Sequence, residues 1–196
     1  DTSDLSYEYA PLELPHQKII VTNSQKARLA VDERYQERQA QCQEALHDLQ
    51  TVIAIQNLSE LTADVFEQVQ EMIRRPVCLR RARHAVTDNQ RTIQAVEALN
   101  KGDIREFGQL MNASHLSLKE DFEVSCEELD ILVEEAWEIE GVLGSRMMGA
   151  GFGGCTISIV ENDAVNEFVS RVGSHYKERT GRTAEFYIME TGNGAS

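Results

Sequence analysis

Residues 144–160, GSRMMGAGFGGCTISIV, decide the fold because they place four glycines between two strand-like runs. The run SRMM precedes the glycines, and the β-branched run CTISIV follows them at once. β-branched residues that are bounded by clustered glycines are typical of strands that end in a turn or loop. The stretch therefore predicts a strand, a glycine loop over 149–154 and a second strand.

The glycines at 149, 151 and 154 match the pattern GxGxxG, but the residues around them exclude a dinucleotide site. That fingerprint needs a helix that opens at its last glycine, whereas a strand-like run follows Gly154. A phosphate-binding P-loop is excluded as well, because no Gly-Lys-Ser/Thr sequence follows. Four glycines indicate repeated positive φ angles or the close approach of another group, and a plain structural turn stays equally open.

The rest of the chain predicts an α+β domain. The runs QKIIVTNS at 17–24 and TAEFYIME at 183–190 are typical of strands. Between the first strand and the glycine loop, apolar residues recur at helical spacing over 35–49, 62–73, 78–100, 103–118 and 125–137, and a further helix is expected from Asn162 or Asp163 to near Gly181. This order predicts a mostly antiparallel four-stranded sheet with a ferredoxin-like core and an inserted block of helices.

The expected helix starts follow from residues that cap helices. Thr62 or Asp64 begins one helix, and Asp103, with Glu106 three positions later, begins another. The sequence SCEE at 125–128 is typical of a capping box that starts at Ser125.

Charge and composition exclude several classes of partner. The net charge of −14 at pH 7 repels nucleic-acid backbones and anionic membranes, so we expect neither as a partner. A phosphorylated ligand would need a local device such as backbone amides.

The four cysteines show no metal-ligand spacing and predict buried free thiols in a reducing compartment. No run reaches membrane length and no signal peptide is present, so we expect a cytoplasmic protein; the first residue is Asp, which indicates a piece of a longer protein.

Beyond these patterns, the chain resembles a known family along almost its whole length. GSRMMGAGFGGCTISIV is similar to the third signature motif of the GHMP kinases, and Phe152 within it points to the galactokinases. Four other stretches resemble galactokinase segments in the same order, namely 4–15, DLSYEYAPLELP; 21–42, VTNSQKARLAVDERYQERQAQC; 79–92, LRRARHAVTDNQRT; and 108–130, GQLMNASHLSLKEDFEVSCEELD.

The resemblance implies the C-terminal part of a two-domain enzyme. Galactokinases transfer the γ-phosphoryl group of ATP to the C1 hydroxyl of α-D-galactose with Mg²⁺, in an active site between two domains. The implied divisions are a lead-in from the missing N-terminal domain over 1–16, a GHMP kinase C-terminal domain over 17–190 and a loose tail over 191–196. The family's catalytic Asp and Arg and its main ATP- and Mg²⁺-binding groups lie upstream of this chain. We therefore expect no catalytic residue and no metal ligand here, and a fragment that is inactive alone.

Two sets of residues carry over from the family by position. Tyr35 matches the tyrosine through which the C-terminal domain contacts galactose, although the pattern of the residues alone favours a half-buried helical aromatic. The loop residues match the third motif, which lies beside the phosphate-transfer region; they are Gly149, Gly151, Phe152, Gly153 and Gly154. The chain departs from the family at Met148, where a threonine is usual, and at Ala150, where a glycine is usual.

Other polar residues are assigned structural roles. Ser114 and His115 are adjacent on a helix and so diverge by about 100°, which excludes a catalytic triad with Asp121. His84, beside three arginines, predicts a solvated basic patch or an interdomain contact. Asn89 lies within an apolar stripe, so its amide must find a hydrogen-bonding partner in the core.

Two other functions stay open at this point. One is a GHMP kinase for a related sugar, such as N-acetylgalactosamine or a uronic acid. The other is a non-catalytic, galactokinase-like sugar sensor, to which Met148 is the only pointer.

Overall fold

The computed structural model describes residues 7–27 and 31–192. Residues 1–6 of the expected lead-in and residues 193–196 of the expected tail lie outside this described part. The strands are β1 (Gln17–Asn23), β2 (Val142–Met147), β3 (Cys155–Glu161) and β4 (Glu185–Met189). The α-helices are α1 (Val31–Leu49), α2 (Ala63–Val69), α3 (Pro76–Asn100), α4 (Ile104–Glu120), α5 (Glu127–Trp137) and α6 (Val165–Thr180).

The four strands form one sheet in the order β2-β3-β1-β4, and every neighbouring pair is antiparallel. The register places Ile20 of β1 opposite Ser158 of β3 and Ile188 of β4. The chain leaves β1, forms five α-helices, returns through the β2–β3 pair and adds α6 and β4. This is the split βαβ arrangement of ferredoxin-like folds, with a block of helices in place of the first helix. The predicted α+β class and its antiparallel sheet are confirmed.

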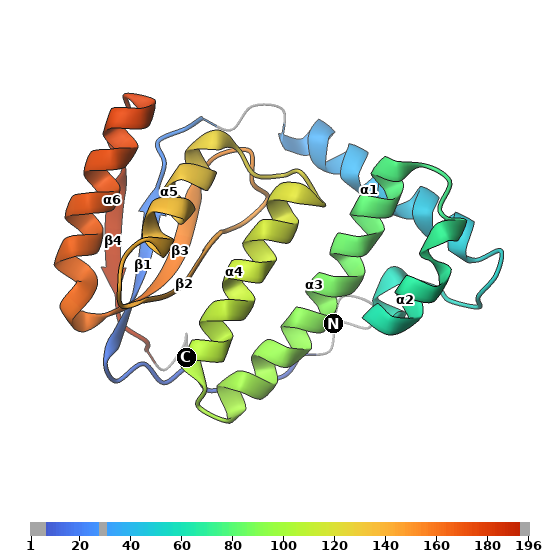
Figure 1. Cartoon of the computed structure of the whole chain (residues 1–196), viewed down its shortest axis with the longest axis horizontal. Coiled ribbons are helices and arrows are strands. Elements are labelled where there is room, and N and C mark those ends of the chain that lie inside the picture. The colour runs from blue at the N-terminus through green and yellow to red at the C-terminus, as the bar shows by residue number, and fades with distance from the viewer. Residues whose placement is uncertain (1–6, 28–30, 193–196) are drawn as a thin grey trace.

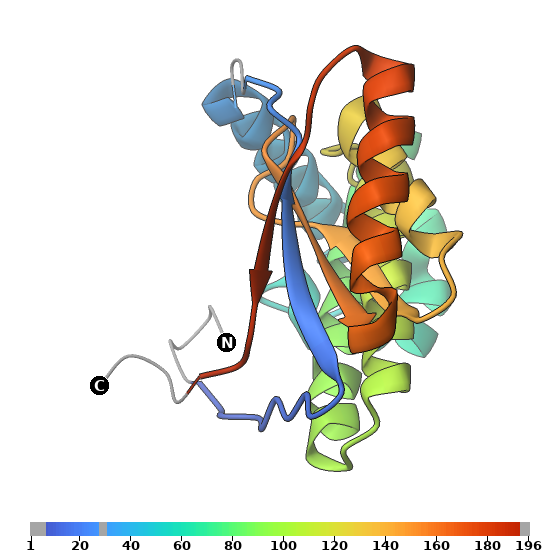
Figure 2. The ribbon, with the colours of Figure 1, turned by 90° about the vertical axis from the view of Figure 1, so that its left-hand side faces the viewer.

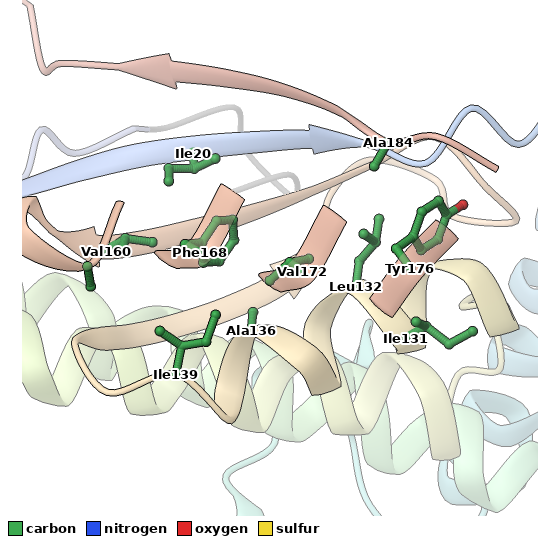
Figure 3. Packing of buried hydrophobic residues seen from close by; sticks show 11 residues of the cluster. Ile20, Ile131, Leu132, Ala136, Ile139, Val160, Phe168, Val172, Tyr176 and Ala184 are labelled. Atoms are coloured by element: carbon green, nitrogen blue, oxygen red, sulfur yellow. The ribbon is translucent and has the colours of Figure 1, made fainter. Parts of the chain in front are cut away.

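Helices α5 and α6 cover one face of the sheet, and Figure 2 shows α6 on that side. Their inner side chains meet those of β1 and β3 in a buried hydrophobic core that Figure 3 shows from close by. The core comprises Ile20, Ile131, Leu132, Ala136, Ile139, Val160, Ala164, Phe168, Val172, Tyr176 and Ala184. The Tyr176 hydroxyl donates a 2.6 Å hydrogen bond to the Ser24 carbonyl, so its polar end is satisfied within this core.

The other helices extend the domain beyond the β2 edge of the sheet. Helix α4 lies beside β2, and α3 packs against α4 on the side away from the sheet (Figure 1). A second cluster of buried side chains joins α1, α2, α3 and the segment between α1 and α2; it includes Leu49, Leu58, Phe66, Cys78 and Val86. Of the helices in the described ranges, none combines the length and the apolar composition that crossing a bilayer requires.

Most helix ends follow their capping residues. The side chains of Thr62 and Asp103 accept hydrogen bonds from the backbone N–H groups of Val65 and Glu106, and α6 ends at Gly181 with φ of 71°. The expected capping box at Ser125 is wrong. Cys126 is the N-cap of α5, and the Ser125 hydroxyl instead donates a 2.5 Å hydrogen bond to Asp130.

Two boundaries and one inner face also differ from the expectation. Strand β2 runs over Val142–Met147, so Met148 lies outside it, and α3 begins at Pro76. Ile93 is expected on the inner face of α3 but is 49% exposed. It lies near the C-terminal end of a long helix, beyond the second core cluster, whose α3 members end at Val86.

Candidate functional site

The glycine loop joins β2 to β3 through backbone conformations that most residues avoid. The N–H of Met148 donates a 3.0 Å hydrogen bond to the Cys155 carbonyl, which closes the loop at its base. Between these two residues, five of the six loop residues have positive φ angles: Gly149 at 74°, Gly151 at 81°, Phe152 at 59°, Gly153 at 127° and Gly154 at 89°. Glycine adopts such angles without steric cost, which explains why the loop is rich in it.

A neighbouring segment also approaches this loop closely. The N–H of Phe152 donates a 2.7 Å hydrogen bond to the Val124 carbonyl. A Cβ atom on Gly151 would lie only 2.1 Å from the same carbonyl oxygen, so no other residue fits there without a shift of the backbone. Repeated positive φ angles and the close approach of another group, which are two of the explanations left open for the clustered glycines, both apply in this loop.

Phe152 is the non-glycine residue of the loop with a left-handed backbone conformation. Such a conformation costs a residue with a Cβ atom about 1–2 kcal/mol. The side chain is 5% exposed and packs in a cluster with Leu118, Val124, Leu129 and Met147, so burial offsets that cost. The Arg34 guanidinium lies 5.1 Å from the centre of the Phe152 ring, which links the loop to α1.

The outer part of the loop presents backbone donors. Within residues 7–27 and 31–192, the N–H groups of Gly149 and Ala150 donate no hydrogen bond. Gly149 is exposed and Ala150 is half-buried. Unpaired N–H groups on a backbone of mixed handedness are suited to an anion.

Tyr35 lies on the first turns of α1 and faces the same region. Its side chain is 48% exposed, and its ring meets the Phe122 ring edge-on at 6.5 Å between centres. Tyr35 and Ala150 line one pocket of about 350 Å³, together with Val31, Asp32 and Gln36. The structure therefore brings the sequence-predicted tyrosine and the glycine loop together in one place.

A second pocket, of about 390 Å³, is lined by Met148 and Gly149 and lies between the sheet and helices α3 and α4. Its walls are mostly apolar, and its polar residues are Asp88, Arg91, Thr92, Ser114 and Arg146. Burial lowers the pKa of the Arg146 guanidinium, which forms no ion pair with a carboxylate in the described part of the chain.

Asp88 contributes a carboxylate to the lining of this second pocket. It accepts a 2.7 Å hydrogen bond from Ser114 and a 3.0 Å hydrogen bond from Arg91. Burial raises the pKa of the Asp88 carboxyl, but Ser114, His84 and Arg91 outweigh that effect and hold it below its usual value.

Ser114, His115 and Asp121 form no triad. Ser114 bonds to Asp88, whereas the Nδ1 atom of His115 accepts a 3.2 Å hydrogen bond from the N–H of Met147. Asp121 accepts a hydrogen bond from Ser117, one helical turn earlier. The three side chains serve separate packing contacts, as the divergence of adjacent helix positions predicts.

His84 does not lie in a solvated basic patch, which was the first of the two expectations for it. His84 is 7% exposed, stacks on the Phe122 ring at 4.5 Å, and shares a 3.0 Å hydrogen bond with Ser117. Burial lowers the pKa of His84 to about 4, so the ring is neutral at pH 7. Arg81, one of the three arginines beside His84 in the expected basic patch, is only 1% exposed. No local pattern marks these two residues as buried, because the segment that covers them, Asp121–Val124, comes from forty residues further along the chain.

Asn89 and the cysteines follow the expectation in part. The Asn89 amide is half-buried and donates a 3.1 Å hydrogen bond to the Ser59 carbonyl, so it has the partner that we expected. All four cysteines are free thiols, but Cys78 alone is buried, and the others are half-buried. Burial raises the pKa of the Cys42 thiol to about 11, which makes it unreactive at neutral pH.

Comparison with known proteins places this geometry in context. Residues 95–178 match the family described as GHMP kinases C terminal. The chain is 52% identical over 196 residues to a galactokinase of Fusobacterium nucleatum and 50% identical over 194 residues to a galactokinase of Levilactobacillus brevis. The two alignments include 100% and 99% of this chain but only 50% of each relative. The chain therefore spans about half the length of the curated relatives that it matches.

Solved structures show the same relationship. The structure of Lactococcus lactis galactokinase complexed with galactose matches at a TM-score of 0.90 with 45% identity, over 94% of this chain and 47% of that one. A mevalonate kinase of L. major matches at a TM-score of 0.57 with 20% identity, over 92% of this chain and 44% of that one. The second likeness concerns the fold alone.

Proposed function

The chain is a homologue of the C-terminal GHMP kinase region of galactokinases, and on that premise we propose that it forms this half of an ATP-dependent galactose kinase. The whole enzyme would transfer the γ-phosphoryl group of ATP to the C1 hydroxyl of α-D-galactose. The Lactococcus lactis relative was crystallised in complex with galactose, which supports the choice of substrate. The free cysteine thiols support a reducing compartment, and we place the enzyme in the cytoplasm.

The observation that carries the proposal is the shared pocket of Tyr35 and Ala150. A phenol hydroxyl both donates and accepts hydrogen bonds, so Tyr35 is suited to a sugar hydroxyl. The adjacent glycine loop offers backbone N–H groups, which attract phosphate oxygens even though the chain as a whole carries a net charge of −14. We assign Tyr35 to sugar binding and residues 149–154 to the neighbourhood of the transferred phosphoryl group.

The other parts of the reaction belong to the upstream half of the protein. Phosphoryl transfer depends on positioned phosphates, a bound metal ion and a group that orients the nucleophile. Within the described residues, no three His, Cys, Asp or Glu side chains are grouped closely enough to hold a metal ion. We propose that the Mg²⁺ ligands belong to the upstream half, and we derive no step through the metal. We propose that the chain contributes sugar contacts and loop backbone, and that it is inactive alone.

The proposal is tested with the full-length protein that contains this chain. ADP release is measured with galactose, N-acetylgalactosamine, galacturonate and glucose as acceptors, and the product is identified by phosphorus NMR. We expect galactose 1-phosphate, with galactose preferred. If one of the related sugars is preferred, that sugar takes the place of galactose as the proposed substrate. If no sugar leads to ADP release, the result supports a non-catalytic sensor.

The role of Tyr35 is tested with a matched pair of variants. Tyr35→Phe removes the hydroxyl and is expected to raise the KM for galactose about tenfold, which corresponds to one lost hydrogen bond of about 1.4 kcal/mol. Tyr187→Phe is the control, because Tyr187 is similarly exposed, at 50%, but lies on β4 at the far edge of the sheet. Equal KM values for the two variants would remove Tyr35 from the sugar site.

A calorimetric titration tests the chain by itself. Galactose and ATP are added separately to the 196-residue chain, and we expect no tight binding of either, because the main binding groups lie upstream. Micromolar affinity for both ligands would overturn the proposed division of the site between the two halves.

A further inference from the structure

We infer that the four-residue segment Asp121–Val124, here called the strap, sets the position of Tyr35 relative to the glycine loop, and that Arg38 is the positioning residue which ties α1 to it. The inference rests on the proposed function in one respect, since Tyr35 is taken to contact the sugar. The strap connects α4 to α5 and lies between α1 and the loop.

The strap is bound to α1 through the Arg38 side chain. The Nε atom of Arg38 donates a 2.7 Å hydrogen bond to the Phe122 carbonyl, and Nη2 donates a 3.1 Å hydrogen bond to the Glu123 carbonyl. The Arg38 side chain is 11% exposed, and its Nη1 atom pairs with Glu37 at 3.1 Å. Arg38 lies three residues after Tyr35, so both side chains leave α1 on the same face.

The next carbonyl of the strap is bound to the glycine loop. The Val124 carbonyl accepts the 2.7 Å hydrogen bond from the N–H of Phe152, and Gly151 lies against the same oxygen. Three consecutive carbonyls, those of Phe122, Glu123 and Val124, therefore hold α1 on one side and the loop on the other.

The strap is held rigid from a third direction, by α3. Glu123 has a left-handed backbone with φ of 54°, and its carboxylate accepts hydrogen bonds from Arg80 at 2.7 Å and Arg81 at 2.6 Å. Arg81 is 1% exposed and also donates to the Asp121 carbonyl and, at 2.8 Å, to Gln41 of α1. A buried guanidinium with this many fixed acceptors leaves the strap little freedom to move.

The strap also contacts Tyr35 directly. The Phe122 ring is stacked on His84 at 4.5 Å and interplanar angle 26°, and it meets the Tyr35 ring at 6.5 Å and 83°. Phe122 thus packs against both His84 of α3 and the exposed Tyr35, so the position of Tyr35 depends on that of the buried α3 surface. Loss of Arg38 would remove the side-chain hydrogen bonds that join this part of α1 to the strap, while Arg81 still holds the strap itself.

This arrangement predicts a specific effect of Arg38. Without it, Tyr35 loses its fixed place, and the KM for galactose rises about tenfold while the KM for ATP changes less than about twofold. Lysine does not substitute, because an ammonium on a flexible stem does not reproduce the planar fork that meets two adjacent carbonyls.

The experiment is a double-mutant cycle in the full-length protein. Arg38→Gln, Tyr35→Phe and the double variant are compared by KM and kcat for both substrates, with Arg38→Lys as a second variant that retains charge. Arg75→Gln is the control, because Arg75 pairs with Glu44 of α1 at 2.7 Å in an ion pair that does not involve the strap. If Arg38 acts through Tyr35, the double variant is no worse than Tyr35→Phe alone. Additive losses, or an equal rise in the KM for ATP, would overturn the inference.

A measurement that needs no turnover separates this inference from the proposed function. Hydrogen exchange of residues 31–38 is followed in the same variants. We expect at least about tenfold faster exchange in Arg38→Gln and Arg38→Lys than in the wild type, and no change in Arg75→Gln. Unchanged exchange in both Arg38 variants contradicts the tie even if the wild type is an active kinase. Absence of wild-type activity with galactose would count against the proposed function and leave this exchange test intact.

Discussion

Gly108 of α4 and Gly144 of β2 lie backbone against backbone. A Cβ atom on Gly108 would be 2.2 Å from the Leu143 carbonyl oxygen, and a Cβ atom on Gly144 would be 2.3 Å from the Gly108 carbonyl oxygen. This contact brings α4 directly onto the edge strand of the sheet (Figure 1). Helix α4 also forms one wall of the second pocket, so the absence of side chains at Gly108 and Gly144 sets how closely that wall approaches the sheet.

The Gly108 contact predicts that alanine at this position lowers the stability of the protein, which is the opposite of what helix propensity alone predicts. Alanine in a helix interior is normally about 1 kcal/mol more stable than glycine. In Gly108→Ala the new methyl group instead meets a backbone carbonyl, and overpacking of this kind is expected to give a net loss of about 2 kcal/mol in the free energy of unfolding. Urea unfolding measures the change.

Gly173 of α6 is the matched control for Gly108. A Cβ atom there would meet the edge of the Phe186 ring at 3.3 Å, and that side chain is half-buried on an edge strand, where it can shift. We expect Gly173→Ala to stabilise the protein by up to about 1 kcal/mol. A stabilising Gly108→Ala would contradict the close contact between α4 and β2.

Gly151 predicts a similar contrast among glycines with positive φ. Gly151 has φ of 81° and faces the Val124 carbonyl at 2.1 Å from an added Cβ, whereas Gly102 has φ of 70° and nothing within 4 Å. Gly102→Ala should cost only the backbone strain of about 1 kcal/mol. Gly151→Ala adds the clash and is expected to cost at least about 3 kcal/mol in total. Equal losses of unfolding free energy in the two variants would argue that the strap does not lie against the loop.

His84 predicts a loss of stability in mild acid. Well above pH 6.5 the ring is neutral in both the folded and the unfolded chain, so it makes no difference to stability. As the pH falls from 6.5 toward the folded pKa of about 4, the unfolded chain takes up a proton that the folded chain refuses. Between pH 7 and pH 5 this lowers the free energy of unfolding by roughly 2 kcal/mol.

The measurement for His84 is the difference between the wild type and His84→Gln in urea unfolding at pH 7 and pH 5. The variant should be less stable at pH 7, because it loses the stacking on Phe122, but it should lose less stability on acidification. His47→Gln, at an exposed position, tests whether removal of any histidine has the same effect. Parallel losses in the wild type and His84→Gln would show that this ring titrates normally.

Asp103 predicts a modest effect that is local to one helix. Its side chain accepts a 2.9 Å hydrogen bond from the N–H of Glu106 at the start of α4. Asp103→Ala should lower the free energy of unfolding by about 1 kcal/mol, and Asp103→Asn, which retains the acceptor oxygen, by only a few tenths. Thermal unfolding of the three proteins gives the comparison; a loss in the asparagine variant as large as in the alanine variant would assign the effect to charge instead.

The residues that sequence reasoning placed correctly are those whose conformation depends on near neighbours. The glycine loop between two strand-like runs, the cap at Asp103 and the end of α6 at Gly181 are all set by steric rules that act within a few residues. Ser125 shows where such rules fail. It has the residue type of a cap, but its hydroxyl bonds to Asp130, and the helix begins after Cys126 instead.

Burial of charged and titratable side chains was beyond the reach of local patterns. Arg81 and His84 lie in a run of arginines that is typical of a solvated surface, yet both are buried beneath the strap. Their burial follows from the packing of α3 against α4 and the strap, which supplies the fixed acceptors that a buried guanidinium requires. No residue within one helical turn of Arg81 indicates that these acceptors lie beside it in the folded protein.

The sequence by itself determined the α+β class, the order of strands and helices and the place of the glycine loop at residues 149–154, because periodicity and the freedom of glycine are local properties. The tertiary structure alone decided that Tyr35 of α1 and Ala150 of the loop line one pocket, and that three carbonyls of the strap bind Arg38 of α1 and the N–H of Phe152 in the loop. These contacts join segments far apart in the chain, and only the packing of helices against the sheet brings such segments within hydrogen-bonding distance.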